Sequence, residues 1–538
     1  IYNLLFIFNL GGMFIEFLRK FHIPIICIAI LLRIENLILF SGLNIDKAIQ
    51  LAATYNFLNG HGILLSTVFT SDLNQICYVP FSGWPPGFTF WILPFTILNN
   101  NFHTVSVIAD CFFMLILFVG VYKLLRSLFN ERAKEYFSLF CLLNMFSFSP
   151  FYYFTSTDRY AVTFFIFALY FFAQLIQNKN NNRLNSLLTA LFIFLAALTR
   201  FAYLPMTIFL PLSIIFIGKF KKDKQLIKNG LASLVLAFVL SASLYAFQKL
   251  YYGNGTYLEQ AKFALHFENL LQFDPILFKT FFFTETFESQ ISKGSSLSSA
   301  LITFKLLFTF TLLFHFLYGL FQRAKKNSHD ILFYFDIVSL IALSITIGTL
   351  VLLSIVSPAT HFNGNLSWTY VEESRYYAPV ILIFQIYLIR LALGMSNDNL
   401  RKLSRVVIYS SISFSILYFS FKHYKILIKH EYAGTYFEDK KVYIDLSKQL
   451  KDQANDNEQI LIASKDETSR TTSIYSGGVP VSNYDSLINT TAKIPMNKTI
   501  WIECKGQKTI EEENFLNRYS GEVIFTSGES TWYKISTQ

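Results

Sequence analysis

The sequence predicts an all-α polytopic membrane protein that ends in a small soluble α/β domain. Three observations support this fold class. The 538 residues are 53% hydrophobic and only 15% charged, whereas an average soluble domain has about 25% charged residues. Eleven apolar stretches approach the roughly 20 residues that a membrane helix needs. Lysine and arginine gather in every second connection between these stretches.

The apolar stretches predict eleven membrane helices in chain order. They lie near residues 21–40, 104–125, 135–154, 160–177, 184–200, 203–218, 229–250, 299–320, 331–356, 377–394 and 404–420. The opening stretch from Ile1 to Phe17 is also apolar, but it contains Gly11, Gly12 and Glu16. Whether it crosses the membrane or lies on its surface stays open.

The basic residues predict the orientation of the helices. They cluster at Arg19-Lys20, at Lys123 to Lys134, around Arg183, at Lys219 to Lys228, at Arg323 to Lys326 and at Arg390 to Arg405. Because basic connections stay in the cytoplasm, we expect a cytoplasmic amino end and an extracytoplasmic carboxyl end. The net charge of +10 is then a topology signal, which argues against a nucleic-acid partner.

One hydrophobic stretch does not fit this alternation as a span. Pro86 to Leu98 is short and contains Pro94. If it crossed the membrane, the Lys123 to Lys134 cluster would lie outside. We therefore expect a helix that lies on the outer membrane surface.

The composition divides the chain into two predicted domains. Residues 1–424 form the transmembrane domain, with a first outer loop at 41–103 and a second large outer loop at 251–298. Residues 425–538 have the composition of a soluble domain. In it, short apolar runs predict buried strands at 460–463 and 499–502, and the sequence further predicts a helix at 511–519 and a terminal β pair at 522–535.

Two acidic residues at the outer ends of spans are candidates for chemistry. Asp46 follows the first span and precedes a helical pattern that ends at Gly60-His61-Gly62. Asp158 lies at the outer junction of the third and fourth spans. A charge at membrane depth is costly and therefore often functional. The alternative for both carboxylates is capping of the helix that follows, with a local ion pair for Asp158.

Two arginines lie on the outer side, against the charge trend. Arg200 stands at the tight turn between the fifth and sixth spans, and Arg375 precedes the tenth span close to Glu372 and Tyr376. Arg200 could snorkel to the interface or bind an anionic ligand at the membrane surface. Arg375 could pair with Glu372 or bind phosphate. Carboxylates with arginines at a lipid surface suit proton transfer and stabilisation of a phosphate leaving group.

The order of these motifs resembles the GT-C membrane glycosyltransferases, particularly bacterial relatives of the protein O-mannosyltransferases and of the lipid A aminoarabinose transferase. The resemblance covers roughly residues 20–400. Its motifs are Asp46 with Gly60-His61-Gly62, Trp84-Pro85-Pro86-Gly87, Thr157-Asp158, Ala197-Leu198-Thr199-Arg200, and Arg375-Tyr376-Tyr377-Ala378-Pro379.

The resemblance implies transfer of a hexosyl or pentosyl group from a polyprenyl-phosphate donor to a lipid, glycan or protein acceptor at the outer face of the membrane. It implies that Asp46 is the general base, that Asp158 shapes the site or holds a metal, and that Arg200 and Arg375 bind the lipid phosphate. The substrate contacts would include His61, Trp84, Glu372 and Tyr376. Because one carboxylate is well placed, we expect a single displacement with inversion.

The sequence departs from the family pattern beside the expected base. Many relatives have an acidic pair in the first loop, whereas here Asp46 is followed by Lys47. This leaves the need for a divalent metal ion open, and no other cofactor is expected.

Two alternative functions remain at this stage, a transporter or flippase of lipid-linked sugars and an O-antigen ligase or polymerase. A transporter would more often show internal repeats and broken helices. A ligase would carry its large outer loop late in the chain. The expected location is the inner membrane of a bacterial cell.

Overall fold

A computed structural model describes most of the chain. The described residues are 16–39, 45–68, 76–80, 84–99, 101–145, 157–177, 182–253, 265, 296–326, 330–356, 377–394, 398–429, 445–446, 459–464, 484–489, 498–527 and 530–536. Most of the opening stretch and most of the second outer loop lie outside them.

The chain divides into two compact units, which are described separately. A helical unit comprises residues 1–36, 112–249 and 254–430. A mixed unit comprises residues 37–111, 250–253 and 431–538. The boundaries predicted from composition, 1–424 and 425–538, remain a prediction.

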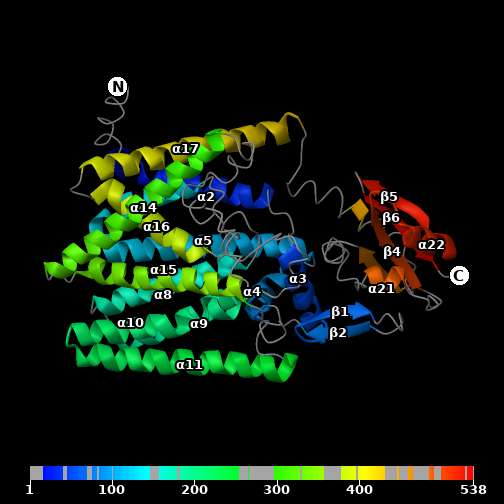
Figure 1. The fold of residues 1–538 in the computed structure, drawn as a ribbon, viewed down its shortest axis with the longest axis horizontal. Helices are drawn as coiled ribbons and strands as arrows, with labels where there is room; N and C mark the ends of the chain where they lie inside the picture. The colour runs from blue at the N-terminus through cyan, green and yellow to red at the C-terminus, as the bar shows by residue number, and fades with distance from the viewer. Residues whose placement is uncertain are drawn as a thin grey trace. The chain divides into compact units, whose positions relative to one another are not determined.

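A helix lies in each of the eleven stretches predicted as spans (Figure 1). They are α2 (His22–Leu39), α5 (Phe102–Phe129), α6 (Ala133–Asn144), α8 (Asp158–Ile176), α9 (Asn182–Thr199), α10 (Met206–Phe220), α11 (Lys224–Tyr252), α14 (Ser296–Lys325), α15 (Ile331–Ile355), α16 (Ala378–Gly394) and α17 (Asp398–Leu427). Within the described part of the chain, eight candidates are long and apolar enough to cross a membrane, with α5 and α6 counted as one. The polytopic α-helical class is therefore confirmed, and the number eleven stays a prediction.

Aromatic contacts show that α6 folds back along α5. The short η1 helix (Asn130–Arg132) joins the two, and Asn130 has a φ of +50°. The ring centroids of Tyr122 and Phe137 lie 5.2 Å apart, and those of Phe118 and Phe140 lie 5.9 Å apart. Earlier residues of α5 thus meet later residues of α6, as two antiparallel helices require.

The helix α16 forms the centre of the helical unit. All of its residues are buried except Arg390 and Gly394. Its Gln385 exchanges hydrogen bonds of 3.1 and 3.2 Å with Asn144 of α6. A helix that is apolar on every side is expected in this position, because protein surrounds it.

The first part of the mixed unit contains the predicted surface helix. After α3 (Ile45–Leu58) come two antiparallel strands, β1 (Leu64–Val68) and β2 (Ile76–Pro80), and then α4 (Gly87–Thr96). Ten residues span about 15 Å, half of the hydrocarbon core of a bilayer. The length of α4 agrees with a helix that does not cross the membrane.

The second part of the mixed unit is a four-stranded sheet near the carboxyl end (Figure 1). Its order is β3 (Gln459–Ser464), β4 (Lys498–Lys505), β6 (Ser530–Ser536) and β5 (Glu522–Ser527). Only β3 and β4 are parallel. The helices α21 (Tyr484–Ile488) and α22 (Ile510–Arg518) pack on one face, while Trp501 and Trp532 are buried on the other. The strands, the helix and the β pair expected from the sequence are confirmed.

Candidate functional site

An ion pair between α8 and the end of α9 joins two of the predicted site residues. Arg200 Nε lies 3.0 Å from Asp158 Oδ1, and both side chains are at most 5% exposed. The two residues are 42 positions apart, so neither the local ion pair nor the snorkelling considered from the sequence describes this arrangement. Burial of Arg200 shows that its guanidinium is held within protein.

Local backbone geometry explains how Arg200 reaches Asp158. α9 ends at Thr199, and Arg200 takes an extended conformation with φ −147° and ψ 124°. Its amide still donates to the carbonyl of Ala196 at 2.9 Å. Asp158 is the first residue of α8, where the positive end of the helix dipole stabilises a carboxylate. The carboxylate is thus stabilised by both the helix and the guanidinium.

Two hydroxyl groups lie beside this pair. Thr157 and Tyr203 are buried, and neither hydroxyl has a hydrogen-bond partner among the described residues. Tyr203 interacts electrostatically with both Asp158 and Arg200. Buried hydroxyls usually find a partner, so these two favour a polar ligand or ordered water near the pair.

The expected base, Asp46, is the second residue of α3. Its side chain lies outside the described part of the structure. Gln50 follows one turn later on the same helix face, is 1% exposed, and has neither amide atom hydrogen-bonded among the described residues. This face of α3 therefore carries a buried polar group that can serve a ligand.

Lys47 forms a buried ion pair that the sequence reasoning missed. Its Nζ lies 2.6 Å from Asp110 Oδ2 of α5, and both side chains are fully buried. Lys47, which directly follows the expected base Asp46, thus fixes α3 against α5. Asp110 lies inside a stretch that the sequence predicts to span the membrane. A carboxylate at that depth indicates a paired or functional group, and this was the signal that could have identified the pair.

The turn after α3 contains two more predicted contacts. The His61 ring stacks on Tyr78 of β2, with centroids 4.1 Å apart and planes 15° apart. Trp84 packs against a buried cluster of Ala53, Ile63 and Tyr252. His61 is exposed and Trp84 is half-buried. These contacts fix the positions of both side chains within the mixed unit.

The third group of predicted site residues is not described. Glu372, Arg375 and Tyr376 lie outside the described residues. The structure resumes at the buried Tyr377, directly before α16. Roles for these three residues therefore rest on the sequence.

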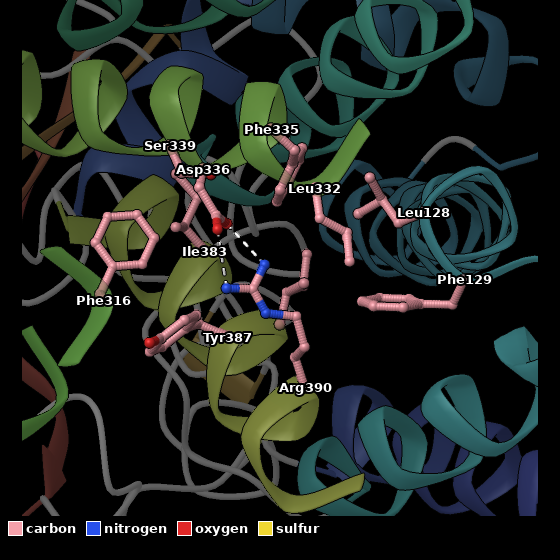
Figure 2. Close-up of a pocket in the computed structure, with 11 residues that line it drawn as sticks. Leu128, Phe129, Phe316, Leu332, Phe335, Asp336, Ser339, Ile383, Tyr387 and Arg390 are labelled. Carbon is pink, nitrogen blue, oxygen red and sulfur yellow. Dashed lines mark hydrogen bonds and ion pairs between the residues drawn. The ribbon is translucent and has the colours of Figure 1, made fainter. Parts of the chain in front are cut away.

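A second cluster of buried charges joins α14, α15 and α16 (Figure 2). Arg390 donates to both carboxylate oxygens of Asp336 at 2.7 and 3.0 Å, and Arg323 donates to Oδ2 at 2.7 Å. Figure 2 shows Asp336 and Arg390 facing one another beside Tyr387. The adjoining cavity of about 10 Å³ has the space of about one water molecule. The cluster is too tightly closed to admit a substrate.

The described residues do not assemble a metal site. Within the described ranges, no three His, Cys, Asp or Glu side chains come together. Asp158 has an arginine as its close neighbour, which is unfavourable for a bound cation. A metal ion does not fit the residues described around Asp158.

Comparisons with known proteins agree with the predicted resemblance. Residues 84–246 match the family model of the dolichyl-phosphate-mannose-protein mannosyltransferases. This segment contains both Asp158 and Arg200. No curated protein matches the chain by sequence.

The fold is similar to that of ArnT from Cupriavidus metallidurans. The crystal structure of the apo state superposes with a TM-score of 0.56 at 12% identity, covering 96% of this chain and 98% of that chain. The crystal structure bound to undecaprenyl phosphate gives a TM-score of 0.48 at 12% identity, with 95% and 97% covered. The resemblance of the chain to GT-C membrane glycosyltransferases is therefore confirmed, with the apo structure showing the shared fold.

Proposed function

We propose that the protein is a glycosyltransferase that moves a sugar from a polyprenyl-phosphate donor to an acceptor at the outer face of the membrane. The observation that carries this proposal is the buried Arg200–Asp158 pair, which lies in the segment matched by the mannosyltransferase family model. That family, by its description, uses a mannose carried on dolichyl phosphate. The sugar and the acceptor class of this chain, whether lipid, glycan or protein, are left to experiment.

In the proposed reaction, Asp46 removes a proton from the acceptor hydroxyl or amine as that group attacks the anomeric carbon. The bond from this carbon to the phosphate oxygen breaks, and the electron pair leaves with the polyprenyl phosphate. Arg200 and Arg375 stabilise the charge of this leaving group. One displacement inverts the configuration at the anomeric carbon.

Asp158 is proposed to position Arg200. A guanidinium has five N–H donors, so one arginine can hold a carboxylate and phosphate oxygens together. The pair through Nε fixes the plane of the guanidinium. Gln50, on the face of α3 that carries Asp46, is proposed to hydrogen-bond the sugar or the acceptor.

The test of Asp46 is transfer of label from a panel of radiolabelled polyprenyl-phosphate sugars by the purified full-length protein. Asp46→Asn should lower kcat by about 10²- to 10⁴-fold, the usual contribution of a general base, with little change in the KM of the donor. Glu513→Gln, at an exposed position of α22, is the matched control and should transfer at the wild-type rate.

Two outcomes would contradict the proposal in different ways. If Asp46→Asn transfers as fast as the wild type, Asp46 is not the base. If no donor is consumed while labelled lipid crosses the bilayer of reconstituted vesicles, the protein is a transporter. For Arg200, which is proposed to bind the donor phosphate and to stabilise the leaving group, Arg200→Lys should raise the donor KM and also lower kcat. Asp46→Asn, by contrast, should leave the donor KM nearly unchanged.

A further inference from the structure

A groove of about 840 Å³ opens in the helical unit where α5, η1, α6 and α8 meet. Its charged lining consists of Lys123 and Arg126 of α5, Glu131 of η1 and Lys134 of α6. Three cations face one carboxylate. The groove therefore has an excess of positive charge, and an anion is the ligand that it would favour.

The floor of the groove is fixed by contacts between α5 and α8. The amide of Gln174 donates to the hydroxyl of the buried Ser127. Gln177 Nε2 donates to the Ser127 carbonyl at 2.6 Å. The ammonium group of Lys123 lies 5.8 Å from the centre of the Tyr170 ring, within the range of a cation–π contact. These contacts hold α5, which carries Lys123 and Arg126, against α8.

The positive charge of the groove exceeds the one negative charge of Glu131. Glu135, the nearby acidic residue of α6, is already paired with Arg19 and Arg132. Within the described part of the chain, Lys123, Arg126 and Lys134 form no ion pair. Clustered cations on one surface repel one another, and a bound anion would relieve that repulsion.

An exposed apolar stripe runs along α5 into the groove. Phe112, Leu115 and Val119 are 47%, 37% and 50% exposed. The same helical spacing continues to Lys123 and Arg126, both of which are exposed. One face of α5 is therefore apolar over its middle turns and basic at its end, which matches the two parts of a phospholipid.

We propose that this groove binds the headgroup of an anionic phospholipid, with its acyl chains along the Phe112, Leu115 and Val119 face. The groove is formed by the Lys123 to Lys134 connection, which the positive-inside rule places at the cytoplasmic leaflet. A free phosphate ion would meet the cations but would leave the apolar stripe unused, so the lipid fits the whole surface better. This site is separate from Asp158 and Arg200 and does not depend on the proposed transfer reaction.

The experiment is a lipid titration of the delipidated full-length protein, followed by native mass spectrometry. Phosphatidylglycerol should bind at least tenfold more tightly than phosphatidylcholine, since each basic residue near anionic lipid contributes roughly fivefold in affinity. The triple variant Lys123→Gln, Arg126→Gln and Lys134→Gln removes three such residues. Its phosphatidylglycerol affinity should therefore fall roughly a hundredfold. Its affinity for phosphatidylcholine should not change.

The matched control removes three exposed lysines of another basic connection, Lys219→Gln, Lys224→Gln and Lys228→Gln, and should keep wild-type phosphatidylglycerol affinity. A variant that keeps the charges, Lys123→Arg with Lys134→Arg, should also bind as the wild type does. Equal affinity of the groove triple variant and the wild type for phosphatidylglycerol overturns the proposal. So does displacement of the bound lipid by millimolar inorganic phosphate, because the site would then hold a free ion.

Discussion

Three buried ion pairs each join one residue of a helical segment to one residue of another segment. Lys47 with Asp110, Asp158 with Arg200, and Asp336 with Arg390 each link two helical segments. Such a pair costs desolvation energy and is weak evidence for net stabilisation, but removing one partner leaves a buried charge uncompensated. Each pair therefore constrains which single substitutions the fold tolerates.

Breaking the Asp158–Arg200 pair from one side should destabilise the protein. Arg200→Met should lower the free energy of unfolding by about 3–5 kcal/mol, because the Asp158 carboxylate is then buried alone. The double variant with Asp158→Asn should be less destabilised than Arg200→Met. Unfolding of the purified protein by heat or detergent measures both.

Arg183→Met, an exposed change on the same α9, is the control and should cost less than about 0.5 kcal/mol. If Arg200→Met is as stable as this control, the pair is not closed in the folded protein. The double variant should still be defective in donor binding, since restored stability does not restore the phosphate-binding charge.

In the sheet domain, a tyrosine makes stability sensitive to alkaline pH. The Tyr484 hydroxyl donates to Glu512 Oε1 at 2.6 Å, and burial together with this bond raises the pKa of Tyr484 above its ordinary value of 10.0. The folded state therefore keeps the Tyr484 proton when the unfolded state has lost it. The resulting stability is fully present below pH 10 and decreases as pH rises above it.

Comparison of the wild type with Tyr484→Phe isolates this effect. Above pH 10, the difference in unfolding free energy between the two proteins should change by about 1.4 kcal/mol per pH unit, in favour of the variant. Urea unfolding monitored by the fluorescence of Trp501 and Trp532, with the other tryptophans replaced, measures it. A difference that is constant from pH 8 to 11 would contradict this assignment.

At the scale of elements, the turn from α3 into β1 depends on two glycines. Gly60 and Gly62 have φ values of +81° and +80°. A Cβ on Gly60 would meet no atom within 4 Å, whereas one on Gly62 would lie 1.9 Å from Tyr251 Oη. The two positions share the backbone conformation and differ in the space around them.

This difference predicts unequal costs of alanine. Gly60→Ala should cost about 1–2 kcal/mol from the left-handed conformation alone, and Gly62→Ala should cost more. Adding Tyr251→Phe to Gly62→Ala removes the clashing oxygen and should recover most of the extra cost. Thermal unfolding of the wild type, the two single glycine variants and the double variant measures these costs. Equal costs at the two glycines would show that Tyr251 does not approach Gly62.

At the scale of the whole molecule, the basic connections predict which parts face the cytoplasm. A protein whose five natural cysteines are replaced can carry one new cysteine at a time. Glu513→Cys, in the sheet domain, should react with a membrane-impermeant maleimide added to intact cells. Lys326→Cys, after α14, should react only once the membrane is opened. Labelling in the reverse pattern would invert the proposed topology.

The sequence predicts the elements of this fold well because their signals are local. The long apolar stretches coincide with helices, and the short apolar runs at Leu461 to Ala463 and at Ile500 to Ile502 coincide with β3 and β4. The pattern of Ala48, Leu51, Ala52 and Tyr55 coincides with α3, in which the first three are buried. Helix periodicity and apolar strand runs are both visible in short windows of the chain, so a single sequence contains them.

The pairing of charges could be predicted only in part. The sequence marks Asp158 and Arg200 as candidates, but it holds no information on which of the distant charges they meet. For the same reason, the sequence did not predict the pairs Lys47–Asp110 and Asp336–Arg390. It does show that Asp110, Asp336 and Arg390 lie inside apolar stretches. Partner choice depends on how helices pack, which periodicity along one chain does not encode.

The Asp336 cluster has a consequence for how the protein is made. Arg323 precedes Asp336 by 13 residues, and Arg390 follows it by 54. At a synthesis rate of about 5–20 residues per second, the 54 residues take roughly three to ten seconds. During that interval we expect Arg323 alone to neutralise the Asp336 carboxylate in the hairpin of α14 and α15. Arg390 of α16 is made last, so we expect α16 to dock its arginine onto a carboxylate that Arg323 already contacts.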